Sequence, residues 1–240
     1  MTPKTNQGKK LTTTEKVIVF DSGVLISFSM NGITDLIKKL KGIFRGKFLI
    51  TREIKKEVID TPLKIKRFSL EALKLKELLD EGVLELPDSM GISDEEISEK
   101  TRAVMETANT SFYGGGRDIH LIDIGESSCI ALSKVLTERG IKNVMAVDER
   151  TTRSLIEEHE NQRRFLERKF HVKININHDK VDLFNGFSVI RSPELVYVAY
   201  KKGLVEIKDH GNVLDALLYA MKFKGASISD QEIEEIKKIK

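Results

Sequence analysis

Three short apolar runs, each followed by a helical pattern, constrain the fold of this chain more than any other feature. The runs cover residues 17–20, 47–50 and 143–147, and they end next to Asp21, Thr51 and Asp148. A continuously apolar strand suits a sheet that is covered on both faces. A strand followed by a helix, repeated along the chain, is typical of right-handed βαβ crossovers. The sequence therefore predicts an α/β fold with a central, mostly parallel sheet.

Residue types that begin helices mark several of the expected helices. Thr51 is a good N-cap for a helix after the second run, and Asp123 with Glu126 has the spacing of a capping box. Ser192, followed by proline, is expected to cap a later helix, and Ser229 is expected to cap the last one. Residues 64–81 have an amphipathic helical pattern that ends at a glycine.

The stretches that lack the strand and helix pattern indicate the domain organisation. Residues 1–15 are polar and are expected to form a flexible tail, and residues 16–240 are expected to form one domain. Two stretches near 87–119 and 157–186 interrupt the strand and helix pattern, so we expect them to be insertions. The consecutive glycines at 114–116 lack the Gly-Lys-Ser/Thr of a phosphate loop and favour a flexible hinge.

Composition excludes some classes of protein and leaves others open. The chain has 40 basic and 37 acidic residues, so any nucleic-acid contact has to come from local clusters of Lys and Arg. The single cysteine, Cys129, lies in an apolar helix pattern and is expected to be a buried structural thiol. With no apolar run near the ~20 residues of a membrane span and no signal-peptide pattern, we expect a cytoplasmic protein without a membrane partner.

Four acidic residues are expected to meet at one edge of the sheet. Asp21 and Asp148 directly follow apolar runs, Glu126 lies in the first turn of a helix, and Glu57 lies about two turns into another helix. Ligands of parallel α/β sheets bind at the carboxyl ends of the strands. Clustered carboxylates repel one another unless a cation neutralises them, and Mg²⁺ and Mn²⁺ prefer oxygen ligands. The pattern therefore indicates a divalent metal site.

Five segments of the chain resemble the PIN-domain nucleases, in the order in which that family carries them. They are VIVFDS at 17–22, TREIKKEV at 51–58, DIGESS at 123–128, VDERTTR at 147–153 and the stretch at 192–205. The resemblance covers most of residues 16–205. It implies a three-layer α/β/α fold and Mg²⁺- or Mn²⁺-dependent cleavage of single-stranded or structured RNA.

The resemblance also implies roles for individual residues. Asp21, Glu57, Glu126 and Asp148 would be metal ligands, Glu149 would assist or replace Asp148, and Ser22 would orient a ligand or a water. Arg150 and Arg153 lie beside the proposed metal site, shortly after Asp148 and Glu149, so their position favours contact with a substrate phosphate. The chain is longer than the compact PIN toxins, and it could act with or without an antitoxin-like partner and as a monomer or homodimer.

Simpler interpretations exist for the same residues. Asp21 can be only a helix cap, Glu126 only part of a capping box, and Glu57 only a solvated charge. Two basic clusters can contact a phosphate backbone or can be solvated helix faces. They are Lys38, Lys39, Lys41, Arg45 and Lys47, and Arg163, Arg164, Arg168 and Lys169.

Two other functions are compatible with parts of the same pattern. The first is a PIN-fold module that binds RNA, or acts as a scaffold, in an RNA-processing or ribosome-associated complex. The second is a phosphatase with an aspartate nucleophile, which also begins with Asp after the first strand. That chemistry requires a second Asp two residues later, where this chain has Gly23, so we set it aside.

Overall fold

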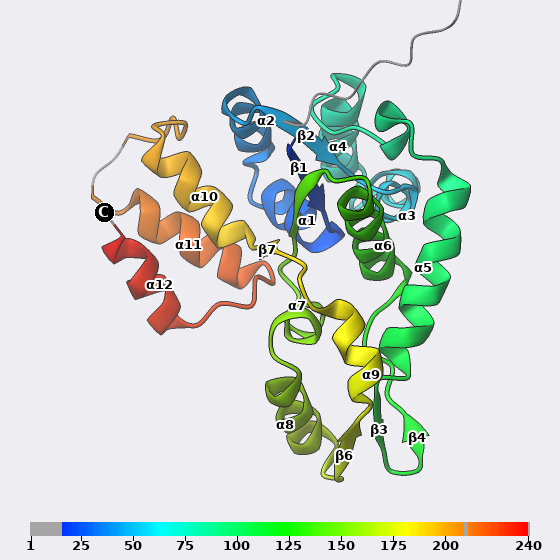
Figure 1. The fold of residues 1–240 in the computed structure, drawn as a ribbon. Helices are drawn as coiled ribbons and strands as arrows, with labels where there is room; N and C mark the ends of the chain where they lie inside the picture. The colour runs from blue at the N-terminus through cyan, green and yellow to red at the C-terminus, as the bar shows by residue number, and fades with distance from the viewer. Residues whose placement is uncertain (1–15, 209–210, 240) are drawn as a thin grey trace, which may run out of the picture.

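The centre of the protein is a parallel sheet whose strands come from widely separated parts of the chain (Figure 1). The computed structural model describes residues 16–208 and 211–239, so the predicted tail at 1–15 lies outside the described residues. The sheet is 4-stranded, in the order β2-β1-β5-β7. Its strands are β1 (Lys16–Phe20), β2 (Gly46–Leu49), β5 (Lys142–Ala146) and β7 (Val189–Ile190). The three predicted apolar runs are confirmed as strands, and β7 adds a short edge strand.

The register of the sheet brings the carboxyl ends of its strands to one edge. Lys16 pairs with both Gly46 and Lys142 at the start of the strands, and Phe20 pairs with Ala146 at the end. The residues that follow β1, β2 and β5 therefore lie at the same edge, as the parallel topology predicts.

Helices cover both faces of the sheet. On one face α6 (Ile124–Glu138) packs against β1 and β5, and α5 (Asp94–Asn109) packs on the outside of α6. On the other face lie α1 (Ser22–Met30), α2 (Thr34–Ile43) and α10 (Ser192–Lys201), as Figure 1 shows. The fold is therefore a three-layer α/β/α arrangement, as expected.

The remaining helices connect or extend these layers. Short turns of helix follow the second strand, and the last helices of the chain lie together on the side of α10 (Figure 1). The helical elements not yet given are α3 (Arg52–Lys55), η1 (Lys56–Asp60), η2 (Pro62–Lys64), α4 (Ser69–Asp80), η3 (Pro87–Met90), α7 (Arg150–Glu157), α8 (His159–Phe170), α9 (His178–Val181), η4 (Asp182–Phe184), α11 (Val213–Phe223) and α12 (Asp230–Lys238). No helix in the described ranges has the length and apolar character needed to cross a membrane.

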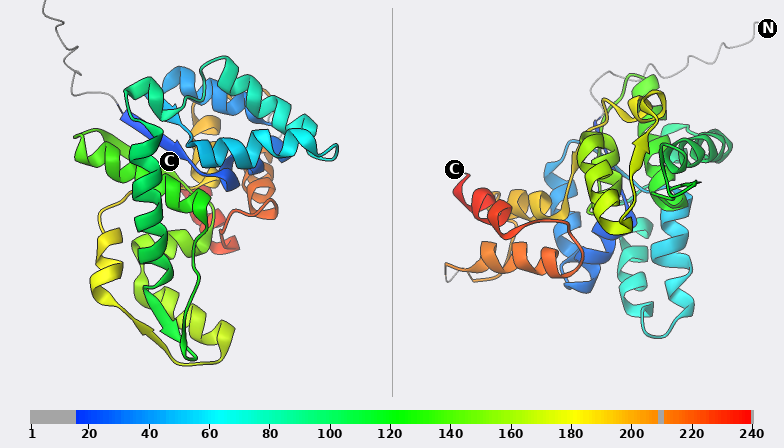
Figure 2. Two further views of the ribbon diagram at one scale, coloured as in Figure 1. Left: turned by 90° about the vertical axis from the view of Figure 1, so that its right-hand side faces the viewer. Right: turned by 90° about the horizontal axis from the view of Figure 1, so that it is seen from below.

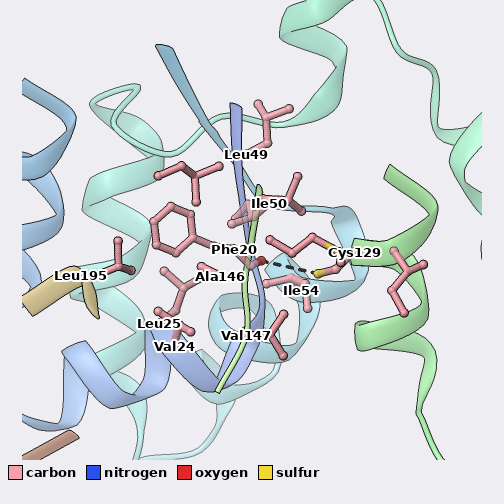
Figure 3. Close-up of a cluster of buried hydrophobic side chains, with 14 of the residues drawn as sticks. Phe20, Val24, Leu25, Leu49, Ile50, Ile54, Cys129, Ala146, Val147 and Leu195 are labelled. Carbon is pink, nitrogen blue, oxygen red and sulfur yellow. Dashed lines mark hydrogen bonds between the residues drawn. The ribbon is translucent and has the colours of Figure 1, made fainter. Parts of the chain in front are cut away.

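The core lies on both faces of β1 and β5. Figure 3 shows Phe20, Leu25 and Leu195 on one side of these strands and Ile54 and Cys129 on the other. All five side chains are almost completely buried. The unbroken apolar character of the strands is thus explained, because alternate side chains enter different halves of the core.

Most of the predicted helix starts are confirmed, with two differences. The hydroxyl of Thr51 accepts a hydrogen bond from the amide of Ile54 at 3.2 Å, and Ser229 accepts one from Glu232 at 3.1 Å. The expected cap at Ser192 is wrong: Arg191 is the N-cap of α10, and Ser192 already lies inside the helix. The helix expected over 64–81 begins later, at Ser69, because residues 62–64 form a separate 3₁₀ turn.

The two irregular stretches meet in a second, antiparallel sheet of order β4-β3-β6. Its strands are β3 (Phe112–Gly114), β4 (Arg117–Asp118) and β6 (Ile174–Ile176), and α8 packs against β6. We call residues 112–118 and 159–176 the small lobe. In Figures 1 and 2 it projects from the body that contains the parallel sheet.

The three consecutive glycines have a specific place in this lobe. Gly115 and Gly116 have φ angles of 62° and 82° and form the tight turn between β3 and β4. Two successive positive φ angles are what a two-residue hairpin turn requires. A Cβ on Gly114 would lie 2.9 Å from the carbonyl oxygen of Lys173, so glycine also allows β6 to approach closely. The segment is therefore a hairpin turn, where the sequence had suggested a hinge.

Candidate active site

Asp21 lies at the end of β1 and uses only one of its carboxylate oxygens for structure. Its amide donates to the carbonyl of Ala146 at 3.0 Å, which continues the pairing of β1 with β5. Its Oδ2 accepts a hydrogen bond from the amide of Gly23 at 3.4 Å and so caps α1. The residue is 3% exposed, and its Oδ1 is buried without a hydrogen-bond partner among the described residues. The capping role is therefore real, and it leaves one buried oxygen free.

The surroundings of Asp21 oppose its negative charge. Burial, followed by the neighbouring carboxylate of Glu126, raises the pKa of Asp21 from 3.8 to about 7, with a smaller contribution from Glu57. Hydrogen bonds from the amides of Ser22 and Gly23 act in the opposite direction. A buried carboxylate in this state is stabilised by a proton or by a cation.

Glu57 and Glu126 approach Asp21 from two different elements. Glu57 lies in η1, a π-helical turn, and Glu126 lies in the first turn of α6. A Cβ built on Gly125 would lie 2.9 Å from Oε2 of Glu57, so the Glu57 carboxylate rests against the start of α6. Glycine at 125 thus leaves room for this carboxylate next to Glu126.

Glu126 combines a capping role with partial burial. Its Oε2 accepts a hydrogen bond from the amide of Asp123 at 3.0 Å, which confirms the predicted capping-box contact. The side chain is half-buried, and burial raises the pKa of its carboxyl group. Like Asp21, Glu126 uses one carboxylate oxygen to cap a helix, and its carboxylate lies near other acidic side chains.

Asp148 lies at the same edge, and both of its oxygens are hydrogen-bonded. Oδ1 accepts from the amide of Ser192 at 2.8 Å, and Oδ2 accepts from the hydroxyls of Ser192 at 2.7 Å and Ser27 at 3.3 Å. Burial raises the pKa of Asp148, and these donors counteract it. A Cβ on Gly23 would lie 3.6 Å from Oδ2 of Asp21 and 3.8 Å from Cβ of Asp148, so the two aspartates flank the same glycine.

The carboxylates of Glu57 and Glu126 lie near enough to Asp21 to act on its charge, and Asp148 lies across Gly23 from Asp21, but the four acids do not form a closed cage. Within residues 16–208 and 211–239, no three His, Cys, Asp or Glu side chains are grouped closely enough to hold a metal ion. The unpartnered Oδ1 of Asp21 and the like charges around it nevertheless fit a cationic ligand at this point. Cys129 lies close by, and burial, then Asp21, raises the pKa of its thiol well above the usual range. It is a buried thiol, as predicted.

Three other predicted site residues, Ser22, Glu149 and Arg150, differ in their exposure and in their contacts. Ser22 is half-buried at the start of α1. Glu149 is exposed and caps α7, with its Oε2 accepting from the amide of Thr152 at 2.8 Å. The Arg150 guanidinium lies over the ring of Phe165, 5.0 Å from its centroid.

Arg153 faces the C-terminal helices. Its Nη1 donates to the carbonyl oxygen of Ser227 at 3.0 Å, and burial lowers the pKa of its guanidinium. Arg191 donates to the same carbonyl at 3.1 Å. Both arginines therefore attach the loop between α11 and α12 to the body of the protein.

Sequence reasoning missed the residues that hold Asp148. Ser27 lies inside an apolar helix and Ser192 follows a short edge strand, so neither position suggested a partner for a distant acid. One usable signal was present, because Ser27 is a polar residue in an otherwise apolar stretch of α1. Buried polar side chains generally have partners, so such a serine points to one.

Comparison with known proteins leaves the geometry of this edge as the main guide to function. The chain matches no family model, no curated protein and no solved structure. Chemically, the edge offers four carboxylates, one of them with an unpartnered buried oxygen, and the exposed Arg150 close in sequence. Carboxylate oxygens are ligands for hard cations, and an exposed guanidinium is a partner for anions.

Proposed function

We propose that this protein is a metal-dependent endoribonuclease of the PIN-domain type, which cleaves RNA phosphodiester bonds with Mg²⁺ or Mn²⁺. The observation that carries the proposal is the buried Oδ1 of Asp21, which has no partner among the described residues in a carboxyl group whose neighbours include Glu126 and Glu57. Keeping such a group buried costs stability at neutral pH. A bound divalent cation offsets that cost.

The proposed ligands are Asp21, Glu57, Glu126 and Asp148. Asp21 contributes its free oxygen, while Glu57 and Glu126 have side chains long enough to turn toward it. Asp148 has hydrogen bonds on both oxygens: Oδ2 accepts two, whereas Oδ1 accepts one and keeps a second lone pair that can bind a cation. When bound, the cation supplies an activated water and stabilises the leaving oxygen of the phosphodiester.

The neighbouring residues take supporting roles in this proposal. Ser22, beside Asp21, orients a ligand or a water, and Glu149 supports Asp148 from the start of α7. We assign phosphate contact to Arg150, which is exposed. Arg153 is less suited to that role, because its guanidinium is bound to the Ser227 carbonyl.

The second candidate is a PIN-fold module that binds RNA without cleaving it. Two observations favour it: the described acids form no closed metal-binding group, and both oxygens of Asp148 already accept hydrogen bonds within the protein. Calorimetry with Mn²⁺ separates the two candidates. Binding that is lost in Glu126→Gln supports the nuclease, and no heat at millimolar Mn²⁺ supports the module.

Cleavage of a labelled single-stranded RNA tests the proposed activity directly. We expect cleavage with Mn²⁺ or Mg²⁺, none with EDTA, and a loss of roughly 100-fold or more in Asp21→Asn, because one metal ligand is removed. Asp179→Asn is the matched control, since Asp179 is an exposed aspartate on α9. Equal cleavage by wild type and Asp21→Asn would disprove the assignment of the site.

A further inference from the structure

The two basic clusters of the sequence differ in how their charges are satisfied. The first cluster lies around α2 and the start of β2, and its lysines are bound to acidic side chains. The ion pairs are Lys38 with Glu81, Lys39 with Asp35 and Glu206, and Lys41 and Lys47 with Glu85. These lysines are therefore largely neutralised by the protein itself.

The second cluster, on α8, keeps two arginines without a carboxylate partner. Arg163 is bound to Glu160 at 2.9 Å and to Glu167 at 2.8 Å. Arg164 and Arg168 are exposed, and neither forms an ion pair with any part of the chain that the structure describes. Their charge is available to an external anion, which distinguishes them from the lysines of the first cluster.

These arginines line a groove of about 790 Å³ on the surface of α8. The groove is lined by Arg150, Asn161, Arg164, Glu167, Arg168 and His171. Positions 161, 164, 168 and 171 recur at helical spacing and so form one stripe, which is about 15 Å long at 1.5 Å per residue.

The acid within the groove does not cancel its positive charge. Glu167 accepts from Arg163 and, at 3.1 Å, from the amide of Ile174, and these donors hold the pKa of Glu167 below its usual range. Its charge is thus satisfied from within the small lobe. The net character of the groove remains basic.

Arg150 connects this groove to the candidate active site. It follows Glu149 directly, begins α7, and stacks on Phe165 of α8. The stripe runs along α8, which belongs to the small lobe that projects from the body in Figures 1 and 2. At the C-terminal end of α8, Phe170 is 39% exposed, and its accessible ring lines a neighbouring hollow with Ile119 and Val172, beside the groove and not in its wall.

We propose that the groove along α8 binds the phosphodiester backbone of single-stranded RNA and guides the strand to the acids beside Asp21. This proposal rests on the proposed nuclease function and adds the path of the substrate. Unpaired arginines match the charge of a phosphate backbone. A single strand is favoured over a duplex because an accessible aromatic ring near a basic groove can stack on unpaired bases.

Fluorescence anisotropy with a labelled 20-nucleotide poly-uridine RNA in EDTA tests the groove without any cleavage. The variant Arg164→Glu/Arg168→Glu is compared with Arg102→Glu/Lys134→Glu, which makes the same change of charge on α5 and α6. We expect the groove variant to bind at least roughly 10-fold more weakly. The slope of log K against log salt should fall by about 1.4, as for two lost phosphate contacts. The control should stay within about twofold of wild type.

Three results would overturn the proposal: equal binding by the groove variant and wild type, equal losses in the groove variant and its control, or equally tight binding of a labelled poly-glutamate peptide. The last result would indicate an acidic protein as the partner. If wild type binds RNA through the groove but cleaves none with Mn²⁺, the groove proposal stands and the nuclease proposal is wrong. RNA cleavage that does not depend on Arg164 or Arg168 would support the nuclease function and rule out the groove as the path of the substrate.

Discussion

Two aspartates at the same edge of the sheet differ in the hydrogen bonding of their carboxylate oxygens, because different residues surround them. Asp21 and Asp148 both follow a buried strand, and both are nearly inaccessible to solvent. Asp21 keeps one oxygen without a described partner, whereas Asp148 receives donors from Ser27 and Ser192. The sequence predicted where both residues lie, but their difference depends on α1 and α10, which reach Asp148 only in the folded protein.

Asp21→Asn is expected to stabilise the metal-free protein at high pH. Folding raises the pKa of Asp21 from 3.8 to about 7, so the ionised form is disfavoured in the folded state. The stability from the neutral carboxyl is present below about pH 4 and is lost as the pH rises through about 7. Asparagine avoids this loss and still caps α1, so the gain at pH 8 should reach at most roughly 4 kcal/mol.

Urea unfolding in EDTA checks this expectation at two pH values. At pH 8 the variant should have the higher free energy of unfolding, and below pH 4 the difference should vanish because Asp21 is then protonated in both states. A variant that is less stable than wild type at pH 8 would contradict the unfavourable burial of this charge.

At the scale of elements, the position of Glu57 depends on a π-helical turn. The amide of Thr61 bonds to the carbonyl of Lys56 at 2.9 Å, which closes the wide turn of η1. The consecutive residues Val58 and Ile59 are both buried there. The sequence predicted one regular helix from Thr51, because periodicity does not reveal a local widening. Such turns recur at functional sites, since they shift a side chain off its regular face.

Gly125→Ala tests whether the close approach of Glu57 to α6 matters. The new Cβ would lie 2.9 Å from Oε2 of Glu57 and 3.4 Å from Cδ1 of Ile54, so the flexible carboxylate has to move. We expect RNA cleavage with Mn²⁺ to fall roughly 10-fold or more, while the free energy of unfolding changes by less than about 1 kcal/mol.

Gly42→Ala is the matched control for that variant. Gly42 lies in α2 with nothing within 4 Å of an added Cβ. Alanine there should leave cleavage unchanged and stabilise the protein by about 0.5–1 kcal/mol. Full cleavage by Gly125→Ala would show that the position of Glu57 is unimportant for the reaction.

At the scale of the whole molecule, local patterns predicted the body better than the small lobe. The parallel sheet followed from apolar runs and helix starts, which are encoded within a few residues. The lobe pairs β3 with β6, and both strands are too short for a recognisable alternation. The edge strand β7 was not predicted for the same reason, because it has only two residues. The positions of Asp21 and Asp148 followed from topology, but the hydrogen bonds of Asp148 depend on contacts between distant segments.

Gly114→Ala is expected to open the small lobe without unfolding the body. An added Cβ would meet Cδ1 of Ile174 and the carbonyl of Lys173, and the backbone atom cannot easily yield. Hydrogen exchange should become faster at Phe112 and Ile174, while protection at Val19 in the parallel sheet persists. Loss of protection throughout the chain would instead show that lobe and body unfold as one cooperative unit.

The pairing of β3 with β6 also has a consequence for synthesis on the ribosome. The β3–β4 hairpin emerges first, and β6 follows only after α6, β5, α7 and α8 have been made. Until then one edge of β3 has no strand beside it, and Phe112, buried in the finished protein, lacks its cover. Open strand edges promote association between chains. A nascent chain arrested just before residue 174 should therefore be the form most in need of chaperone protection.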